Sequence, residues 1–476
     1  MTRRRRLRSM LVLLGTTGAA TLLAACGGGG SGGGNDGGGD SSGACGETAR
    51  KQWVLDVTRD WYLFPETLPA TVDLAAYATA EGLLDALTAT ARSQGKDRYF
   101  SYLTTRGAEN SLFDEGEFVG FGFRTRTDDS NRPIVLDVYE ASPAAAAGLR
   151  RGDEIVAVDA GSGYVAVSQS LVGGVTITDL LGPATAGVTR GLRILRNGST
   201  FDTSMTKRTV TLDPVPNDFG TAVLPLAGTT GVGYVHLRSY ISTADAQLRT
   251  AFATLRAQGL QYFIVDLRYN GGGLVSTAQL IDDLLGADRV TSDVQYRMVH
   301  NAARSSQNAT VRFQPQAQSV APVRIAFLTT AATASASEIN INTMKPWVEI
   351  AIVGSDTLGK PVGQYAFDLS NSCEDRLRLI AFKTVNALDQ GDYYDGLASS
   401  VPFACAAPDT PDAPMGAVDD SMVEEAMYWL GNGACRTVMS AGAVDGQFKP
   451  AAEQRAASYP RPQQPSDVEH WLPGVQ

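Results

Sequence analysis

The stretch that most constrains how this chain can fold is residues 325–364, which read as an apolar strand, a turn of small residues, a helical segment and a second apolar strand. Two serines, Ser335 and Ser337, lie in the turn where the helical segment begins. The first turn of a helix has free backbone N–H groups and the positive end of the helix dipole, and both favour developing negative charge. A serine at this position is therefore well placed to act as a nucleophile.

Ser335 also has a purely structural interpretation, because Ser335 and Glu338 match the Ser-x-x-Glu capping box that starts many helices. Lys360, which follows the second strand, favours chemistry instead. A serine nucleophile needs a base, the chain has only three histidines, and a desolvated lysine can replace histidine. Such a lysine must lose its proton near neutral pH, so its pKa must fall from about 10.4 to roughly 7–8. Gln364 lies close enough along the chain to orient the amine.

Together these positions resemble the C-terminal processing peptidases, also called tail-specific serine proteases. In that family the nucleophile lies in an Ala-Ser-Ala-Ser-Glu segment, which matches residues 334–338, and the lysine lies in a Thr-x-Gly-Lys loop, which matches residues 357–360. The first serine of the family's segment precedes the lysine by the same interval as Ser335 precedes Lys360. The resemblance therefore selects Ser335 over Ser337.

The resemblance implies a Ser-Lys dyad. Ser335 would attack the scissile carbonyl, Lys360 would take its proton, and Gln364, at the position of the family's glutamine, would orient the lysine. Pro361 departs from the family, which usually has glycine at this position. Proline fixes φ and lacks an N–H group, so it bears directly on the direction in which the lysine side chain points.

A triple glycine follows the apolar strand at residues 262–267, within the segment Asp-Leu-Arg-Tyr-Asn-Gly-Gly-Gly at residues 266–273. Bare N–H groups at the end of a strand can bind a phosphate or an oxyanion. No Gly-x-Gly-x-x-Gly or Gly-Lys-Ser/Thr pattern accompanies them, which argues against a nucleotide. The resemblance implies an oxyanion hole formed by the N–H groups of Gly272 and Ala336, with Gly271 in place of the family's proline.

Two further groups of residues could take part in catalysis. Asp266 could act near the serine, but a strand-end aspartate more often pairs with a neighbouring arginine, here Arg268, and we expect that pair. A Ser-His-Asp triad would need one of the three histidines, His236, His300 or His470. None lies beside a motif, and His236, within an apolar strand, is expected in the core.

The N-terminus has the pattern of an exported, lipid-modified protein. A short arginine run precedes the mostly apolar residues 11–23, and the segment Leu-Ala-Ala-Cys ends at Cys26. This resembles a bacterial lipoprotein signal, which implies removal of residues 1–25, lipidation of Cys26 and a Gly-rich tether at residues 26–46. Gly27, next to the cysteine, resembles an outer-membrane sorting signal. We therefore expect a lipid-anchored protein of the bacterial cell envelope, at the periplasmic face of the outer membrane.

Export places the remaining cysteines, Cys45, Cys373, Cys405 and Cys435, in an oxidising compartment. Their even number allows two disulfides in one of three pairings. We expect Cys373 to pair with Cys405, because these two bracket one compact stretch, which leaves Cys45 with Cys435. No Cys-x-x-Cys motif or adjacent histidine accompanies them, so no metal site is expected.

Changes of pattern divide the chain into domains. Residues 47–112 have helical periodicity, residues 113–210 have strands and turns, residues 211–435 alternate strands with helices, and residues 436–476 form a Pro-rich tail. The fold class is therefore multidomain α/β and α+β, with a small helical N-terminal domain and a β domain. The resemblance implies that residues 211–435 form a serine-protease core of the crotonase-like, tail-specific protease type.

Residues 113–210 resemble a PDZ domain, because a Phe-Val-Gly-Phe-Gly-Phe opening, an Ala-Gly-Leu helix end and a Gly-Asp-x-Ile strand occur in that order. PDZ domains bind a peptide as an extra strand and hold its terminal carboxylate with backbone N–H groups. The resemblance implies that this carboxylate loop consists of Gly120, Phe121, Gly122 and Phe123. A helix at residues 171–181 would line the groove. The other interpretation of the glycines is that they only form a tight turn.

The charge of the chain limits the classes of partner that it is expected to bind. The formal net charge is −10, and no block of Lys and Arg occurs beyond residue 8, which argues against nucleic acid. We expect a serine endopeptidase without a cofactor, which acts on proteins or peptides with accessible C-termini. A homo-oligomer is compatible with the sequence.

Two other classes remain open at this point. The chain could be an inactive peptide-binding scaffold in which Pro361 holds Lys360 away from Ser335. It could also be an esterase-like hydrolase that uses the same serine, although no Gly-x-Ser-x-Gly motif is present.

Overall fold

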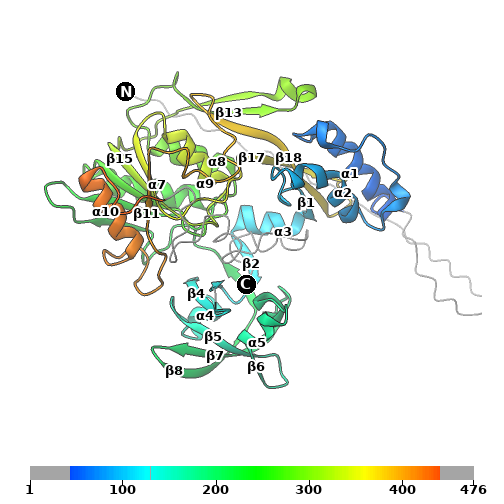
Figure 1. Ribbon diagram of the computed structural model, residues 1–476, viewed down its shortest axis with the longest axis horizontal. Helices are drawn as coiled ribbons and strands as arrows, with labels where there is room; N and C mark the ends of the chain where they lie inside the picture. Colours follow the sequence, from blue (N-terminus) through cyan, green and yellow to red (C-terminus); the bar gives the residue numbers. More distant parts are fainter. Residues whose placement is uncertain (1–42, 129, 440–476) are drawn as a thin grey trace, which may run out of the picture. The chain divides into compact units, whose positions relative to one another are not determined.

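The computed structural model describes residues 43–128 and 130–439 (Figure 1). The predicted signal peptide, the lipidation site Cys26, the tether up to residue 42 and the tail from residue 440, with His470, lie outside the described residues.

A six-stranded sheet after residue 211 supports the candidate site. The strand order is β10-β11-β12-β15-β16-β19, in which β10 is antiparallel to β11 and all other neighbours are parallel. The strands are β10 (Thr221–Leu224), β11 (Val232–His236), β12 (Tyr262–Asp266), β15 (Arg324–Thr329), β16 (Glu349–Gly354) and β19 (Phe403–Ala406). Because β12 and β15 are parallel neighbours, the glycine loop and the serine turn that follow them meet at one edge of the sheet.

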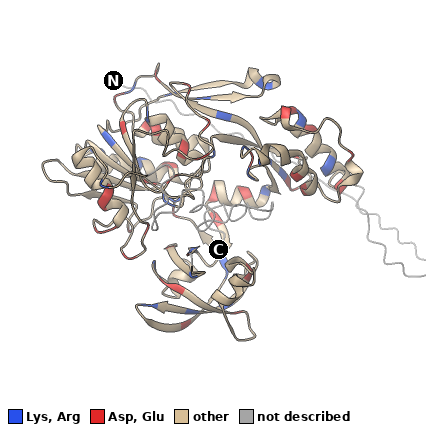
Figure 2. Cartoon of the chain, in the orientation of Figure 1, with Lys and Arg blue, Asp and Glu red and all other residues tan. Residues whose placement is uncertain are grey.

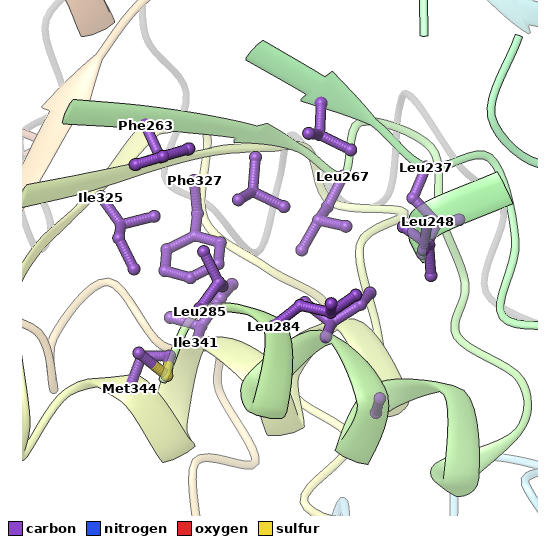
Figure 3. Close-up of a cluster of buried hydrophobic side chains, with 14 of the residues drawn as sticks. Leu237, Leu248, Phe263, Leu267, Leu284, Leu285, Ile325, Phe327, Ile341 and Met344 are labelled. Carbon is purple, nitrogen blue, oxygen red and sulfur yellow. The ribbon is translucent and has the colours of Figure 1, made fainter. Parts of the chain in front are cut away.

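Helices cover both faces of this sheet. They are α7 (Ala244–Arg256), α8 (Val275–Leu284) and α9 (Ala336–Met344) on one face and α10 (Ser421–Asn432) on the other. Side chains alternate along each strand, so Phe263 packs with the first three helices while its neighbour Ile264 packs with α10. Figure 3 shows Phe263 and Phe327 above Leu284 and Ile341 in the first of these cores. Burial on both faces explains why these strands read as continuous apolar runs.

A second, antiparallel sheet carries the lysine loop. Its strands are β1 (Tyr102–Thr105), β13 (Val294–His300), β14 (Ala309–Arg312), β17 (Val362–Asp368) and β18 (Asp375–Asn386). The long β18 pairs with β17 along one edge and with β1 and β13 along the other. Lys360 lies two residues before β17, so this sheet determines where the lysine is held.

The N-terminal helices form where the periodicity predicts, as α1 (Glu47–Trp61) and α2 (Ala80–Ser93). Thr79 caps α2 by accepting a hydrogen bond from the N–H of Gly82. Their buried residues, including Val54 and Leu84, share one hydrophobic cluster with Leu377 of β18. Residues 47–112 therefore do not enclose a core of their own, and they also contribute a strand, β1, and the short helix α3 (Arg106–Asn110).

Residues 117–211 form what we call the β domain. Its main sheet has the order β3-β4-β5-β7-β8 with β6 beside β5, and β2 pairs with β9. The strands are β2 (Glu117–Gly120), β3 (Phe123–Thr127), β4 (Pro133–Val138), β5 (Glu154–Asp159), β6 (Tyr164–Ala166), β7 (Thr189–Arg196), β8 (Ser199–Thr206) and β9 (Arg208–Thr211), with the helix α4 (Pro143–Ala146). A core around Phe121, Phe123 and Ile155 holds them together.

The prediction of one helix at residues 171–181 is wrong. Two short helices occur instead, α5 (Val167–Val172) and α6 (Ile177–Leu181). Gly173 ends the first helix, Gly174 has a φ of 85°, and Thr176 begins the second by a capping box with Asp179. The two glycines therefore interrupt the apolar periodicity that suggested a single helix.

The predicted disulfide pairing is also wrong. Cys45 pairs with Cys373 and Cys405 pairs with Cys435. Cys45 precedes α1, which packs on β18, and Cys373 lies in the turn between β17 and β18. Cys405 lies on β19 and Cys435 follows α10, which packs over the same sheet. Each disulfide joins elements that pack against each other in one hydrophobic cluster. The spacing of the cysteines along the sequence does not show which elements pack together.

Charged residues of both signs are scattered over the described elements (Figure 2). Among residues 43–128 and 130–439, every helix is too short or too polar to cross a membrane.

Candidate active site

Ser335 lies directly before α9, in a strained backbone conformation with φ 56° and ψ −116°. A residue other than glycine adopts such a conformation only where the surroundings enforce it. The N–H of Ser335 donates to Glu338 at 2.9 Å, and the N–H of Ala334 donates to the carbonyl of Asn270 in the glycine loop at 3.1 Å. The turn is thus held from both sides, and the serine is partly exposed.

Ser337 has a different environment. It is completely buried, and its hydroxyl donates to the carbonyl oxygen of Asn270 at 3.0 Å. A hydroxyl that is enclosed and bonded in this way serves to fix the glycine loop to α9. The two serines, equivalent in the sequence, therefore occupy distinct positions.

Lys360 points toward Gln364, as the sequence predicts for its partner. The Lys360 Nζ donates to Gln364 Oε1 at 2.9 Å, and Gln364 Nε2 in turn donates to the carbonyl of Phe100. The ammonium also lies 5.0 Å from the centre of the Phe100 ring. Pro361 is the residue directly before β17, a position where a missing N–H is tolerated. Its carbonyl accepts a hydrogen bond from the N–H of Thr384.

The surroundings of Lys360 favour its neutral form. Burial lowers the pKa of the lysine from 10.5 to about 8, although the carboxylates of Asp97 and Glu338 oppose this effect. Asp97 is itself completely buried and accepts hydrogen bonds from Tyr62 at 2.9 Å and Ser101 at 2.7 Å. An amine with this pKa can accept a proton near neutral pH, which a general base requires.

Glu338 connects the serine turn to the lysine loop. Its Oε2 accepts the N–H of Ser335 at 2.9 Å and the N–H of Lys360 at 2.8 Å. Its Oε1 accepts the N–H of Gly359 at 2.8 Å and the hydroxyl of Thr357 at 2.5 Å. Because one buried carboxylate binds the backbone of both residues, Ser335 and Lys360 are held as neighbours.

Gly272 lies against the serine. A methyl group at this glycine would lie 2.8 Å from the Cβ of Ser335 and 2.9 Å from the N of Ala336, and its φ is 102°. Only glycine fits there. The N–H of Gly272, however, donates to Asn270 Oδ1 at 2.9 Å, so Asn270 occupies the donor that was assigned to the oxyanion hole. Within the described residues, the N–H of Ala336 donates to no acceptor.

The other candidate catalytic residues have structural partners. Asp266 is completely buried and forms an ion pair with Arg268 at 2.5 Å, as expected. His236 is 1% exposed, with its Nδ1 3.6 Å from Asp266, which agrees with a core histidine. His300 contacts Asn308 at 3.3 Å and Tyr365 at 2.9 Å.

Three contributions to the site were missed from the sequence. Phe100 and Asp97 come from the N-terminal segment and surround the lysine, and Asn270 bonds to the glycine loop. The motif that contains Asn270 can be recognised in the sequence. It does not show, however, that the Asn270 side chain accepts the N–H of Gly272. The link from Phe100 to Gln364 joins residues that are remote in the chain and has no local signal.

The predicted carboxylate loop has an unusual hydrogen-bond pattern. The carbonyl of Phe121 accepts from the N–H of Ala144 at 2.9 Å, and the carbonyl of Gly122 accepts from the N–H of Tyr139 at 2.9 Å and from the hydroxyl of Ser142 at 3.2 Å. By contrast, the N–H groups of Phe121 and Gly122 donate to no acceptor in the part of the chain that the structure describes. Both carbonyls are engaged, whereas both N–H groups belong to buried residues and have no acceptor among the described residues.

One group of potential metal ligands occurs among the described residues: Cys405, Glu425 and Cys435. The two cysteines are joined in a disulfide, and Glu425 accepts from the N–H of Arg436 at 2.8 Å. Thiolates are the form in which cysteine binds metal, so the oxidised pair does not offer these ligands.

Comparison with known proteins gives two family matches. The model for peptidase family S41 matches residues 231–394, and the model for the S41 N-terminal domain matches residues 49–102. The first of these ranges contains the glycine loop, the serine turn and the lysine loop. The second contains the segment whose Phe100 and Asp97 surround the lysine.

Individual proteins give the same picture. A chloroplastic C-terminal processing peptidase of Tetradesmus obliquus is 29% identical over 58% of this chain and 58% of its own length. A carboxyl-terminal-processing protease of Synechocystis is 25% identical over 56% of this chain and 59% of its own length. The matched region thus spans less than two thirds of these relatives.

A solved structure shows the same fold. It is a protein of Bacteroides fragilis assigned to the S41 proteases, with a TM-score of 0.63 and 22% sequence identity, and the match covers 79% of this chain and 96% of that chain. Two models of peptidase family S41 thus match this chain in order along one sequence, and its similarity to that family covers residues 49–102 and 231–394.

Proposed function

We propose that this protein is a serine endopeptidase with a Ser335–Lys360 dyad that cleaves exported proteins or peptides. The observation that carries the proposal is the pair of hydrogen bonds from the Ser335 and Lys360 N–H groups to one oxygen of buried Glu338. This carboxylate holds the strained serine next to a lysine whose pKa is lowered to about 8. The similarity to peptidase family S41 and the chemistry of the site thus support the same reaction.

In the proposed reaction, Ser335 Oγ attacks the scissile carbonyl carbon while neutral Lys360 Nζ takes the hydroxyl proton. The lysine then passes that proton to the leaving amine, and an acyl-enzyme remains on Ser335. Lys360 Nζ then takes a proton from a water molecule that attacks the ester carbonyl, and it returns this proton to Ser335 Oγ as the acid product leaves. Gln364 accepts a hydrogen bond from Nζ without adding a charge, so it fixes the direction of the amine and leaves its pKa low.

The tetrahedral intermediate carries an oxyanion that needs N–H donors. Ala336 offers one at the N-terminus of α9, where the helix dipole adds to its effect. We propose Gly272 as the second, after the Asn270 amide has moved away from its N–H group. Loss of one such donor costs about 3–4 kcal/mol of transition-state stabilisation in a comparable enzyme.

We further propose that the β domain is PDZ-like and captures the C-terminal tail of the substrate. The available N–H groups of Phe121 and Gly122 support this, because they form a site for a carboxylate. A tail held there would bring a nearby unstructured segment to Ser335. The lipoprotein-like N-terminus supports a location at the bacterial cell envelope, with an anchor through Cys26.

One observation favours a second candidate, an inactive peptide-binding scaffold. The N–H of Gly272 is already bonded to Asn270, so the oxyanion hole lacks one of its two donors in this structure. If this bond persists when a peptide is bound, the β domain would bind tails without cleavage.

The test is cleavage of an unstructured protein with a free C-terminal tail by the wild type and by Ser335→Ala, Ser337→Ala and Lys360→Ala. We expect the wild type to cleave, and Ser335→Ala and Lys360→Ala to be inactive. Ser337→Ala should retain activity if it folds, because the Ser337 hydroxyl faces Asn270.

Other outcomes identify the alternatives. Activity that survives both Ser335→Ala and Lys360→Ala would rule out the dyad. Tail binding without cleavage by the wild type would establish the scaffold, and hydrolysis of small esters but no peptide would indicate an esterase.

A further inference from the structure

Lys207 is a buried cation next to the predicted carboxylate loop. It lies between β8 and β9, directly before Arg208 of β9, which pairs with Gly120 of β2. Only 3% of the residue is exposed. Its ammonium nitrogen lies 5.0 Å from the centre of the Phe121 ring, and Phe121 is one of the two residues whose N–H groups are available.

The ammonium group has only neutral partners. Lys207 Nζ donates to the carbonyl oxygens of Gly182 at 2.5 Å and Pro183 at 3.0 Å, just after α6. No described carboxylate forms an ion pair with it. The nearest charged influence is Arg190, which has the same sign, and burial together with Arg190 lowers the pKa of Lys207 to about 8.

An unpaired buried charge is costly, so its presence needs an explanation. The carbonyls of Gly182 and Pro183 could be capped by a neutral donor at a lower cost. What the surroundings lack is an anion, and two available N–H groups of the adjacent loop also lack an acceptor. A single carboxylate bound at the loop would satisfy the N–H groups and lie in the field of the ammonium.

We propose that Lys207 is a specificity-determining residue that selects a free C-terminal carboxylate in the tail of the substrate. This rests on the proposed function, in which the β domain captures that tail. The ammonium acts from beneath Phe121 through its charge, while the N–H groups of Phe121 and Gly122 bond to the carboxylate directly. A tail that ends in an amide would make similar backbone contacts but gain nothing from the charge.

Arg208 does not provide the same charge. Its side chain is exposed, and its guanidinium donates to the carbonyls of Thr209 and Ala141. Charges in water are strongly screened, whereas an ammonium within the protein acts through a medium of lower dielectric constant. Lys207 should therefore dominate the selection.

The experiment measures binding to the full chain in the Ser335→Ala background, which prevents cleavage. Two short fluorescent peptides with the same apolar C-terminal residue are titrated, one with a free carboxylate and one with a carboxamide. The quantity of interest is the ratio of their dissociation constants, because a loss of folded protein affects both peptides equally and leaves the ratio unchanged.

Three variants separate charge from structure. Lys207→Gln keeps a donor for the carbonyls of Gly182 and Pro183 but removes the charge, and Lys207→Arg keeps the charge. Arg193→Met is the matched control, since Arg193, on β7 of the β domain, is a partly exposed cation that pairs with Asp202.

We expect the Ser335→Ala chain with its native Lys207 to prefer the carboxylate. Adding Lys207→Gln should reduce the ratio of the two dissociation constants about tenfold, as for one charge interaction across a partly screened distance. Lys207→Arg and Arg193→Met should keep it. An unchanged ratio in Lys207→Gln would overturn the role of Lys207 while leaving tail capture intact. If the wild type itself does not distinguish the two peptides, the proposed tail capture is wrong.

Discussion

Lys360 shows how the surroundings of a single residue change its acid–base chemistry. On its own it is a lysine in a loop, but burial beside Phe100 lowers its pKa to about 8. The spacing of Ser335, Lys360 and Gln364 was readable from the sequence because short motifs carry all three. The residues that surround Lys360 could not be predicted from the sequence, because Phe100 and Asp97 come from a segment far away in the chain.

The lowered pKa predicts a definite pH dependence. Below about pH 8 Lys360 is mostly protonated and cannot accept the proton of Ser335, so kcat/KM should rise with pH through an apparent pKa near 8 and then level off. Initial cleavage rates of a quenched fluorescent peptide between acid and alkaline pH measure this. A profile that is flat from neutral to alkaline pH would contradict a lysine base.

Glu338 was predicted only as a helix cap. It does accept the N–H of Ser335 at the start of α9, and it also binds the lysine loop. Its second oxygen binds the lysine loop, through Thr357 and Gly359, and sequence spacing gives no hint of a partner from another strand.

Substituting Glu338 by glutamine should therefore impair both stability and activity. The amide NH₂ of Glu338→Gln would face N–H donors and leave buried groups unsatisfied, at a cost of about 2–4 kcal/mol in the free energy of unfolding. Urea unfolding and peptide cleavage measure the two effects. Glu424→Gln, on the exposed ion pair with Arg436, is the control and should change neither. Full activity of Glu338→Gln would mean that the carboxylate does not align the dyad.

At the scale of elements, the apolar strands of the six-stranded sheet were predicted, because burial on both faces leaves a continuous apolar run. The strands β13, β14 and β17 were not, since their partly exposed residues lack such a run. The predicted helix at residues 171–181 is split because Gly173 ends the first helix and Gly174 has a positive φ. The apolar periodicity alone does not show where such glycines end a helix.

The disulfides connect elements, and their pairing can be tested directly. Peptide mapping of the unreduced protein should recover Cys45 linked to Cys373 and Cys405 linked to Cys435. Removing the first bond in a Cys45→Ser/Cys373→Ser variant should lower the free energy of unfolding by about 2–4 kcal/mol, because it closes a very long loop. Recovery of Cys373 linked to Cys405 would contradict the structure.

At the scale of the whole molecule, buried charges tie the β domain to the segments that follow β11 and β12. Arg238, which follows β11, is 1% exposed and forms two hydrogen bonds with Asp137 of β4, at 2.8 and 2.9 Å. Arg151 of the β domain bonds to Tyr269 at 3.0 Å, one residue before Asn270. Such contacts between distant parts of the sequence have no local pattern, so no motif predicted them.

Breaking the first contact should destabilise the protein strongly. Arg238→Leu leaves Asp137 buried without a partner, and we expect a loss of about 3–5 kcal/mol in the free energy of unfolding. The double variant Arg238→Leu/Asp137→Leu should lose less, since the buried charge of Asp137 is removed and Glu140, the other partner of Arg238, is partly exposed. Urea unfolding of both compares them, and equal losses would show that the pair contributes through packing and not through charge.

The central claim is that Ser335 is a nucleophile activated by Lys360, and a fluorophosphonate probe tests it most directly. Such a probe reacts with activated serines, and mass spectrometry of the labelled peptides locates the adduct. We predict one adduct on Ser335 in the wild type and in Ser337→Ala, and no adduct in Lys360→Ala. An adduct on another residue, or labelling of Ser335 that is unaffected by Lys360→Ala, would contradict the dyad.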